Sequence, residues 1–120
     1  MAEWVTMGDG SQRAYADVTI TVATDNDLSE VLDLNEYLVT AIQMPAALTS
    51  ATIGFQVSAE AATGFGALSI DGTAISLAFT ASQVEVMSPK VGNAMYRYLK
   101  ISTASAEGSN RTFRVFGIKL

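Results

Sequence analysis

The chain has 120 residues, which is the size of one domain. Hydrophobic residues make up 49% of it and charged residues 16%, a balance that excludes a disordered chain and favours one buried core. It contains no cysteine and no histidine. Disulfides, thiolate or imidazole metal sites and catalytic triads built on either residue are therefore excluded. We expect no enzyme activity, no cofactor and no bound metal.

Acidic and basic residues are unevenly distributed along the chain. The net charge is −5, so we expect no binding of nucleic acid through a general basic surface. Residues 1–36 contain eight acidic residues and one arginine, whereas residues 89–120 contain six basic residues and one glutamate. The two ends can pair within one fold, which we favour, or neighbouring copies can attract each other head to tail.

The first ten residues have neither the basic start nor the apolar stretch of a signal peptide. No apolar run approaches the roughly 20 residues that a transmembrane helix needs. We therefore expect a protein that is made in a cytoplasm, contacts no membrane, and reaches the exterior, if ever, through assembly.

Alternating apolar and polar residues predict short strands from Asp17 onwards. Residues 17–23 form the first, followed by a turn at residues 25–27. Residues 29–44 fit either an amphipathic helix or two strands, at 31–34 and 37–43, joined by a turn at Asn35-Glu36. We favour the two strands because β-branched residues fill the second half of this stretch.

The same alternation continues to the end of the chain. Gly54, within an alternating run at 51–58, indicates a bulge or a close backbone contact. Asp71-Gly72 is typical of a hairpin turn. The remaining expected elements are strands at 68–70, 75–79, 83–86, 95–101 and 112–120, and a loop at 88–93.

Eight or nine short strands separated by turns predict an all-β fold. We expect a single-domain β-sandwich or jelly roll of about eight strands over residues 16–120, preceded by an extended N-terminal arm at residues 1–15.

Two groups of side chains are candidates for small ligands. Asp25 and Asp27 offer oxygens to calcium, but no EF-hand spacing surrounds them, so we interpret them as solvated turn carboxylates. Four aromatic residues are possible parts of a sugar-binding platform: Trp4, Phe65, Tyr96 and Tyr98. Core packing is the favoured interpretation for Phe65 and for part of the tyrosine pair.

Two further groups are candidates for protein contacts. The lone Trp4 lies before the first expected strand, where a tryptophan often anchors a tail onto a neighbouring surface, and Val5 and Met7 accompany it. Arg97, Arg111 and Arg114 lie in the basic last third and are expected to meet an acidic partner surface or an acidic second copy.

Several stretches resemble small all-β virion-associated proteins of tailed bacteriophages, from about Ala16 to Leu120. The most distinctive is Ile42-Gln43-Met44-Pro45-Ala46. The others are Val31-Leu32-Asp33-Leu34, Tyr37 to Ala47, Phe55-Gln56-Val57-Ser58 and Tyr96-Arg97-Tyr98-Leu99-Lys100-Ile101. The resemblance implies a structural role in a virion and carries no catalytic motif.

The resemblance does not fix the place in the particle, and within that role the function expected first is that of a capsid decoration or cement protein. Its partners would be the major capsid protein and copies of itself, in a trimer, and it would be located in the virion. The alternatives are a receptor- or glycan-binding module of a head fibre or tail tip, and a head–tail or tail structural component.

Overall fold

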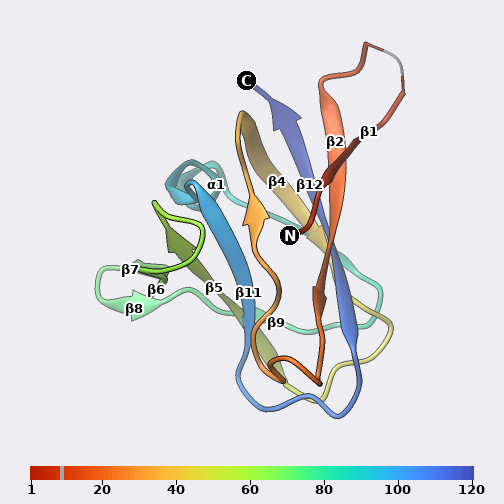
Figure 1. Cartoon of the computed structure of the whole chain (residues 1–120), viewed down its shortest axis with the longest axis vertical. Coiled ribbons are helices and arrows are strands. Elements are labelled where there is room, and N and C mark those ends of the chain that lie inside the picture. The colour runs from red at the N-terminus through yellow and green to blue at the C-terminus, as the bar shows by residue number, and fades with distance from the viewer. Residues whose placement is uncertain (9) are drawn as a thin grey trace.

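Two antiparallel sheets enclose the core in the computed structural model, which describes residues 1–8 and 10–120 (Figure 1). The first sheet has the order β1 (Trp4–Thr6), β2 (Arg13–Ile20), β12 (Arg111–Lys119), β4 (Tyr37–Gln43) and β10 (Val84–Val86). The second has the order β3 (Leu32–Asp33), β11 (Tyr98–Thr103), β5 (Thr52–Ser58) and β6 (Gly66–Ala67), and β9 (Leu77–Ala78) also pairs with β5. The short strands β7 (Ser69–Ile70) and β8 (Thr73–Ala74) form a separate hairpin.

The core lies between the inner faces of the two sheets. In β2 and β12 every second residue is buried, as a strand with one covered face requires. Phe113 of the first sheet and Phe55 of the second belong to the same buried cluster and are at most 1% exposed. Burial of each such side chain stabilises the fold by about 1.5–3 kcal/mol, so this cluster holds the two sheets together.

The all-β prediction is confirmed, with twelve strands and one helix among the described residues. There are more strands than the eight expected, because the chain between Gly66 and Ala78 is divided into four two-residue pieces. Most strands in succession change sheets: β2, β4, β10 and β12 lie in the first, and β3, β5 and β11 in the second.

The extended arm expected at residues 1–15 is not confirmed. β2 already begins at Arg13, and residues 4–6 pair with it as the edge strand β1. Ahead of β1, the Ala2 N–H donates to the Val31 carbonyl at 2.9 Å, and Ala2 is buried. The backbone of this segment is therefore satisfied within its own domain.

Local turn chemistry accounts for two confirmed predictions. Asn35 has a positive φ of 51° and its N–H donates to Asp33 Oδ1 at 3.0 Å, which turns the chain between β3 and β4. Asp71 and Gly72 have φ of 51° and 81°, the paired positive values of a tight hairpin turn.

The prediction of a loop at 88–93 is wrong, because the helix α1 (Pro89–Ala94) forms there. Ser88 caps it by accepting from the Val91 N–H, and Pro89 occupies its first turn, where no N–H is needed. The strand expected from Met95 begins only at Tyr98, because Met95 closes the helix. No helix in the described part of the chain is long and apolar enough to cross a membrane.

Candidate functional site

The outer face of the first sheet carries a row of apolar side chains that runs across all of its strands. The register pairs Val5 with Tyr15, Tyr15 with Phe116, Phe116 with Ala41, and Ala41 with Val86. Side chains at directly paired positions point to the same face of a sheet. We call this row of five residues, Val5, Tyr15, Ala41, Val86 and Phe116, the apolar stripe.

The apolar stripe is open to solvent in the monomer. Val86 is 79% exposed and Val5 is 47% exposed, at the two edges of the sheet, while the residues between them are half-buried. Met7 and Ile118 extend the apolar surface on one side, since the Met7 N–H bonds the Arg13 carbonyl and Ile118 pairs with Arg13. Contiguous exposed apolar surface is typical of interaction sites, which makes this face a candidate.

The row on the other side of the apolar stripe is polar over β2, β12 and β4, where Asp17, Arg114 and Gln43 pair, and ends at the exposed Val84 of β10. Arg114 donates to both oxygens of Asp17, at 2.8 and 3.1 Å, and its guanidinium carbon lies 4.1 Å from the centre of the Tyr15 ring. Hydrogen bonding to Asp17 raises the pKa of Arg114 above its usual value. The pair thus fixes one flank of the Tyr15 ring and bounds the apolar surface.

The three residues expected in an N-terminal anchor divide between two environments. Trp4 points inward: its Nε1–H donates to the Asp33 carbonyl at 2.9 Å, and its ring stacks on Tyr37 at 4.5 Å. It packs against the core because residues of a strand alternate between faces and Trp4 pairs with buried Ala16. Val5 and Met7 lie on the outer face, in the apolar stripe and beside it.

The three candidate arginines do not form one basic patch. Arg97 bonds Asp33 at 3.0 Å, Arg111 bonds Glu107 at 2.9 Å, and Arg114 bonds Asp17. Lys119 and Glu36 form a fourth pair, 3.6 Å apart. Of the four pairs, all except Arg111–Glu107 join the acidic first third to the basic last third. The interpretation that the two ends pair within one fold is therefore confirmed.

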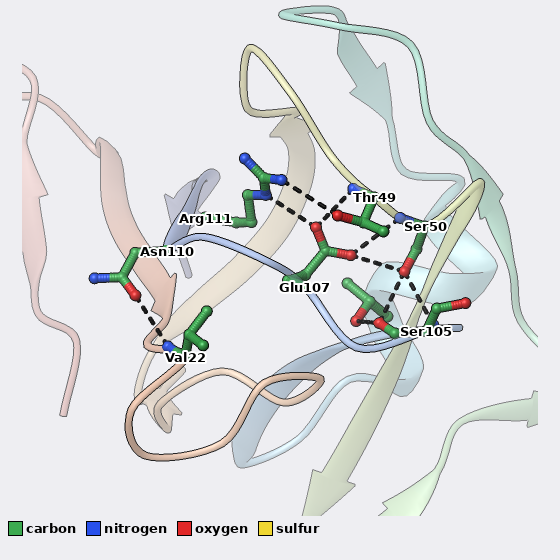
Figure 2. Close-up of polar contacts among 8 residues, drawn as sticks. Val22, Thr49, Ser50, Ser105, Glu107, Asn110 and Arg111 are labelled. Carbon is green, nitrogen blue, oxygen red and sulfur yellow. Dashed lines mark hydrogen bonds and ion pairs between the residues drawn. The ribbon is translucent and has the colours of Figure 1, made fainter.

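Glu107 is the centre of a buried polar cluster (Figure 2). Its carboxylate accepts from the backbone N–H groups of Thr49 and Ser50 at 2.7 and 3.0 Å, and from Arg111 Nε at 2.9 Å. The Ser50 hydroxyl lies 2.8 Å from Oε2. Because these contacts tie the segment before β5 to the loop before β12, their role is structural.

A polar groove of about 360 Å³ lies near the turn after β2. The rings of Trp4, Phe65, Tyr96 and Tyr98 are not among its lining residues, and Lys100 Nζ lies over Phe65 at 4.6 Å. The aromatic platform is therefore not assembled in this groove. The groove is lined by Thr19, Thr21, Thr24, Asp25, Leu28, Ser29, Glu30, Val31 and Lys100.

Asp25 and Asp27 interact with each other at the turn after β2. A hydrogen bond with Asp25 is the main cause that raises the pKa of Asp27 above its ordinary value. In the described ranges 1–8 and 10–120, no group of three or more acidic side chains is arranged to hold a metal ion. Both carboxylates belong to an exposed turn, in keeping with the favoured interpretation.

Sequence reasoning missed Tyr15, Ala41, Val86 and Phe116 as candidate site residues. A signal existed in the last strand, where Phe113 and Val115 face one side and Phe116 and Ile118 the other. A strand that is apolar on both faces needs a second covering surface. Which residues of different strands lie side by side depends on the strand register, and the sequence alone does not show that register.

No protein-family model, curated protein or solved structure matches the chain.

Proposed function

We propose that the chain is a jelly roll. In such a fold a long antiparallel hairpin of eight strands rolls up, so that the first strand pairs with the last and the pairs nest inward. Four observed pairs nest in this way: β2 with β12, β3 with β11, β4 with β10, and β5 with β6. Rolling also brings β12 beside β4 and β11 beside β5, as in the two sheets here. On this proposal β1 extends one edge, and β7 to β9 are an excursion after β6.

For the function, we infer a structural protein of a tailed-phage virion that decorates and stabilises the capsid. The jelly roll is a recurrent fold of viral capsid proteins, and the sequence resemblance points to the same class. The observation that carries the proposal is the exposed apolar stripe. An exposed apolar sheet face fits a protein surface, whereas a small-ligand site is a concave pocket with a few convergent polar groups.

The mechanism is mechanical rather than catalytic. Each bound copy stabilises the shell because it binds the assembled state and not the dissociated one. Many copies act together on one particle, so a modest affinity at each position is sufficient. Because Arg97 and Arg114 already form ion pairs within the fold, the main contact for a partner is the apolar stripe rather than the basic strands.

The copy number per purified virion tests this function. Quantitative mass spectrometry against the major capsid protein is expected to give close to one copy per capsid subunit, or three per local three-fold axis. A few copies or about a dozen per particle would overturn decoration and favour the head–tail or tail role, or the glycan-binding module.

A binding experiment complements the count. Virions stripped of this protein are mixed with the wild-type chain, with Val86→Lys, or with the control Tyr96→Lys, whose ring is 62% exposed outside the apolar stripe. The wild type and the control are expected to bind and to restore heat resistance. Particles that neither bind the wild type nor gain heat resistance would contradict a cement role.

A further inference from the structure

The outer edge of β10 has open backbone groups. The Met87 N–H, at the end of β10, donates to the Thr40 carbonyl at 2.9 Å. In an antiparallel pair every second residue turns its backbone groups to the partner strand, so with this register Glu85 also faces β4. The N–H and C=O groups of Val84 and Val86 therefore point away from the sheet. β10 is the last strand of the first sheet, and these groups form no hydrogen bond with the described part of the chain.

The side chains at this edge define the chemistry of a neighbour that would cover it. Val84 and Val86 are 47% and 79% exposed on the outer face, where Val86 ends the apolar stripe. Glu85, between them, pairs with the buried Ile42 and so points to the inner side of the sheet rim. It takes part in none of the ion pairs within residues 1–8 and 10–120. A matching strand therefore carries apolar side chains beside the two valines and a basic side chain beside Glu85.

The other sheet edges are less suited to an added strand. Two residues before β1, Ala2 forms a bridge with Leu32 of the second sheet, so the chain bends away from the first sheet there. In the second sheet, β6 and β9 already pair with the side of β5 that β11 leaves free. β10 is therefore the better edge for a strand that extends the first sheet.

We propose that an extended segment of the capsid partner adds to the five-stranded first sheet beside β10, as a sixth strand. Its residues beside Val84, Glu85 and Val86 are apolar, basic and apolar. An extended chain fits because its backbone groups repeat at the spacing of those on the edge, whereas a helix has already paired its own. A partner that covers the apolar stripe reaches this edge at Val86. The proposal rests on the proposed function for the identity of the partner and adds how that partner is held.

Hydrogen–deuterium exchange resolved to single amides tests strand addition in the wild-type protein. In the free protein the Val84 and Val86 amides should exchange fast, while the Met87 amide is the protected reference. On virions stripped of this protein and then reloaded with it, both fast amides should slow at least about tenfold, because the added strand hydrogen-bonds them. If the virions bind the protein and both rates stay as in the free protein, strand addition is wrong and decoration stands.

A proline substitution separates the backbone from the side chain at Val84, which lies outside the apolar stripe. Val84→Pro removes an outward N–H at a position where edge strands accept proline, so the urea midpoint should change little. Val84→Thr is the matched control, because it keeps this N–H and nearly the same side-chain volume. Binding to stripped virions should weaken about tenfold or more in Val84→Pro and less than about threefold in Val84→Thr. Wild-type binding by Val84→Pro would overturn the proposal.

Three further outcomes concern the occupant of the edge. Glu85→Lys should weaken binding severalfold, and more at low salt, because it brings two basic side chains together. Unchanged binding by this variant would overturn the stated chemistry of the segment. Protection of Val84 and Val86 in concentrated protein without virions would show that a second copy occupies the edge, and would overturn the proposal. Stripped virions that do not bind the wild type would overturn both this proposal and the proposed function.

Discussion

The indole ring of Trp4 lies directly on the backbone of Gly117. A Cβ atom at Gly117 would fall 2.7 Å from Trp4 Cη2 and 2.8 Å from Cζ3, closer than side chains approach each other. On its other side the Leu38 carbonyl oxygen would be 3.2 Å away. The absence of a side chain at Gly117 is thus what allows the N-terminal segment to pack against the sheet.

Gly117→Ala is therefore expected to displace the Trp4 ring. The added methyl group overpacks the contact and should cost about 1–3 kcal/mol of unfolding free energy. The chain has one tryptophan, so its fluorescence emission reports this site and should shift to longer wavelength. Gly66→Ala is the matched control, because nothing lies within 4 Å of a Cβ there, and it should change neither property.

The double variant Trp4→Phe with Gly117→Ala separates this contact from a general effect of alanine in β12. The smaller ring relieves the clash, so the two losses of unfolding free energy should be less than additive. Strictly additive losses would show that Trp4 and Gly117 do not interact.

How far the sequence predicts this fold depends on the range of the interactions. Asn35 and Asp71-Gly72 announce their turns because the chemistry of a turn is local. For Trp4 the sequence predicts an anchor on a partner instead. Its actual contact, Gly117, is far away in the sequence, so no local pattern indicates it. The helix at Pro89 was missed although Ser88 and Pro89 are a start signal, because Gly92-Asn93 also fits a loop. Gly92 is required there for packing: a Cβ atom would fall 2.6 Å from the Val39 carbonyl oxygen.

The candidate site was predictable only in part, for a related reason. Val5 and Met7 are candidates in the sequence only as companions of Trp4 in an anchoring segment, and they lie on the outer sheet face. Their neighbours Phe116 and Val86 come from strands that only the register brings together. Periodicity shows which residues share a face of one strand, but it does not align different strands.

Glu107→Gln should destabilise the fold strongly, because it replaces a fully buried carboxylate that accepts several hydrogen bonds. Losing the charge-assisted bonds should cost about 2–3 kcal/mol, and Glu107→Ala should cost about 3–5 kcal/mol because it also strands Arg111. Urea unfolding measures both. Glu36→Gln, at an exposed ion pair, is the control and should leave the midpoint unchanged. A wild-type midpoint in Glu107→Ala would contradict the structural role of the cluster.

The three candidate arginines should differ in their effect on stability. The Arg111 side chain is 17% exposed, while Arg97 and Arg114 are 54% and 42% exposed. Arg111→Gln should therefore lower the urea midpoint clearly, and Arg97→Gln and Arg114→Gln should leave it close to the wild type. If either of the last two weakens binding to particles at unchanged stability, the basic strands contact the partner as first expected.

Two carboxylates with lowered pKa values determine the pH range in which acid should destabilise the fold. Burial alone would raise the pKa of Glu107, but hydrogen bonds from Thr49, Arg111 and Ser50 outweigh it and hold the pKa below its ordinary 4.5. A hydrogen bond from Arg97 is the main cause that lowers the pKa of Asp33 below 3.8. A carboxyl group whose pKa is lower in the folded state stabilises the fold above its unfolded pKa. This contribution is lost as the pH falls through the folded pKa.

The urea midpoint is therefore expected to stay level from about pH 7 to about pH 5 and to fall below that. Asp27, whose pKa is raised by Asp25, acts in the opposite direction, because its protonation favours the folded state. Glu107→Gln should flatten the acid limb of the curve, since glutamine does not titrate, while Asp27→Asn should steepen it slightly. An acid limb of unchanged slope in Glu107→Gln would show that Glu107 keeps its ordinary pKa in the folded protein.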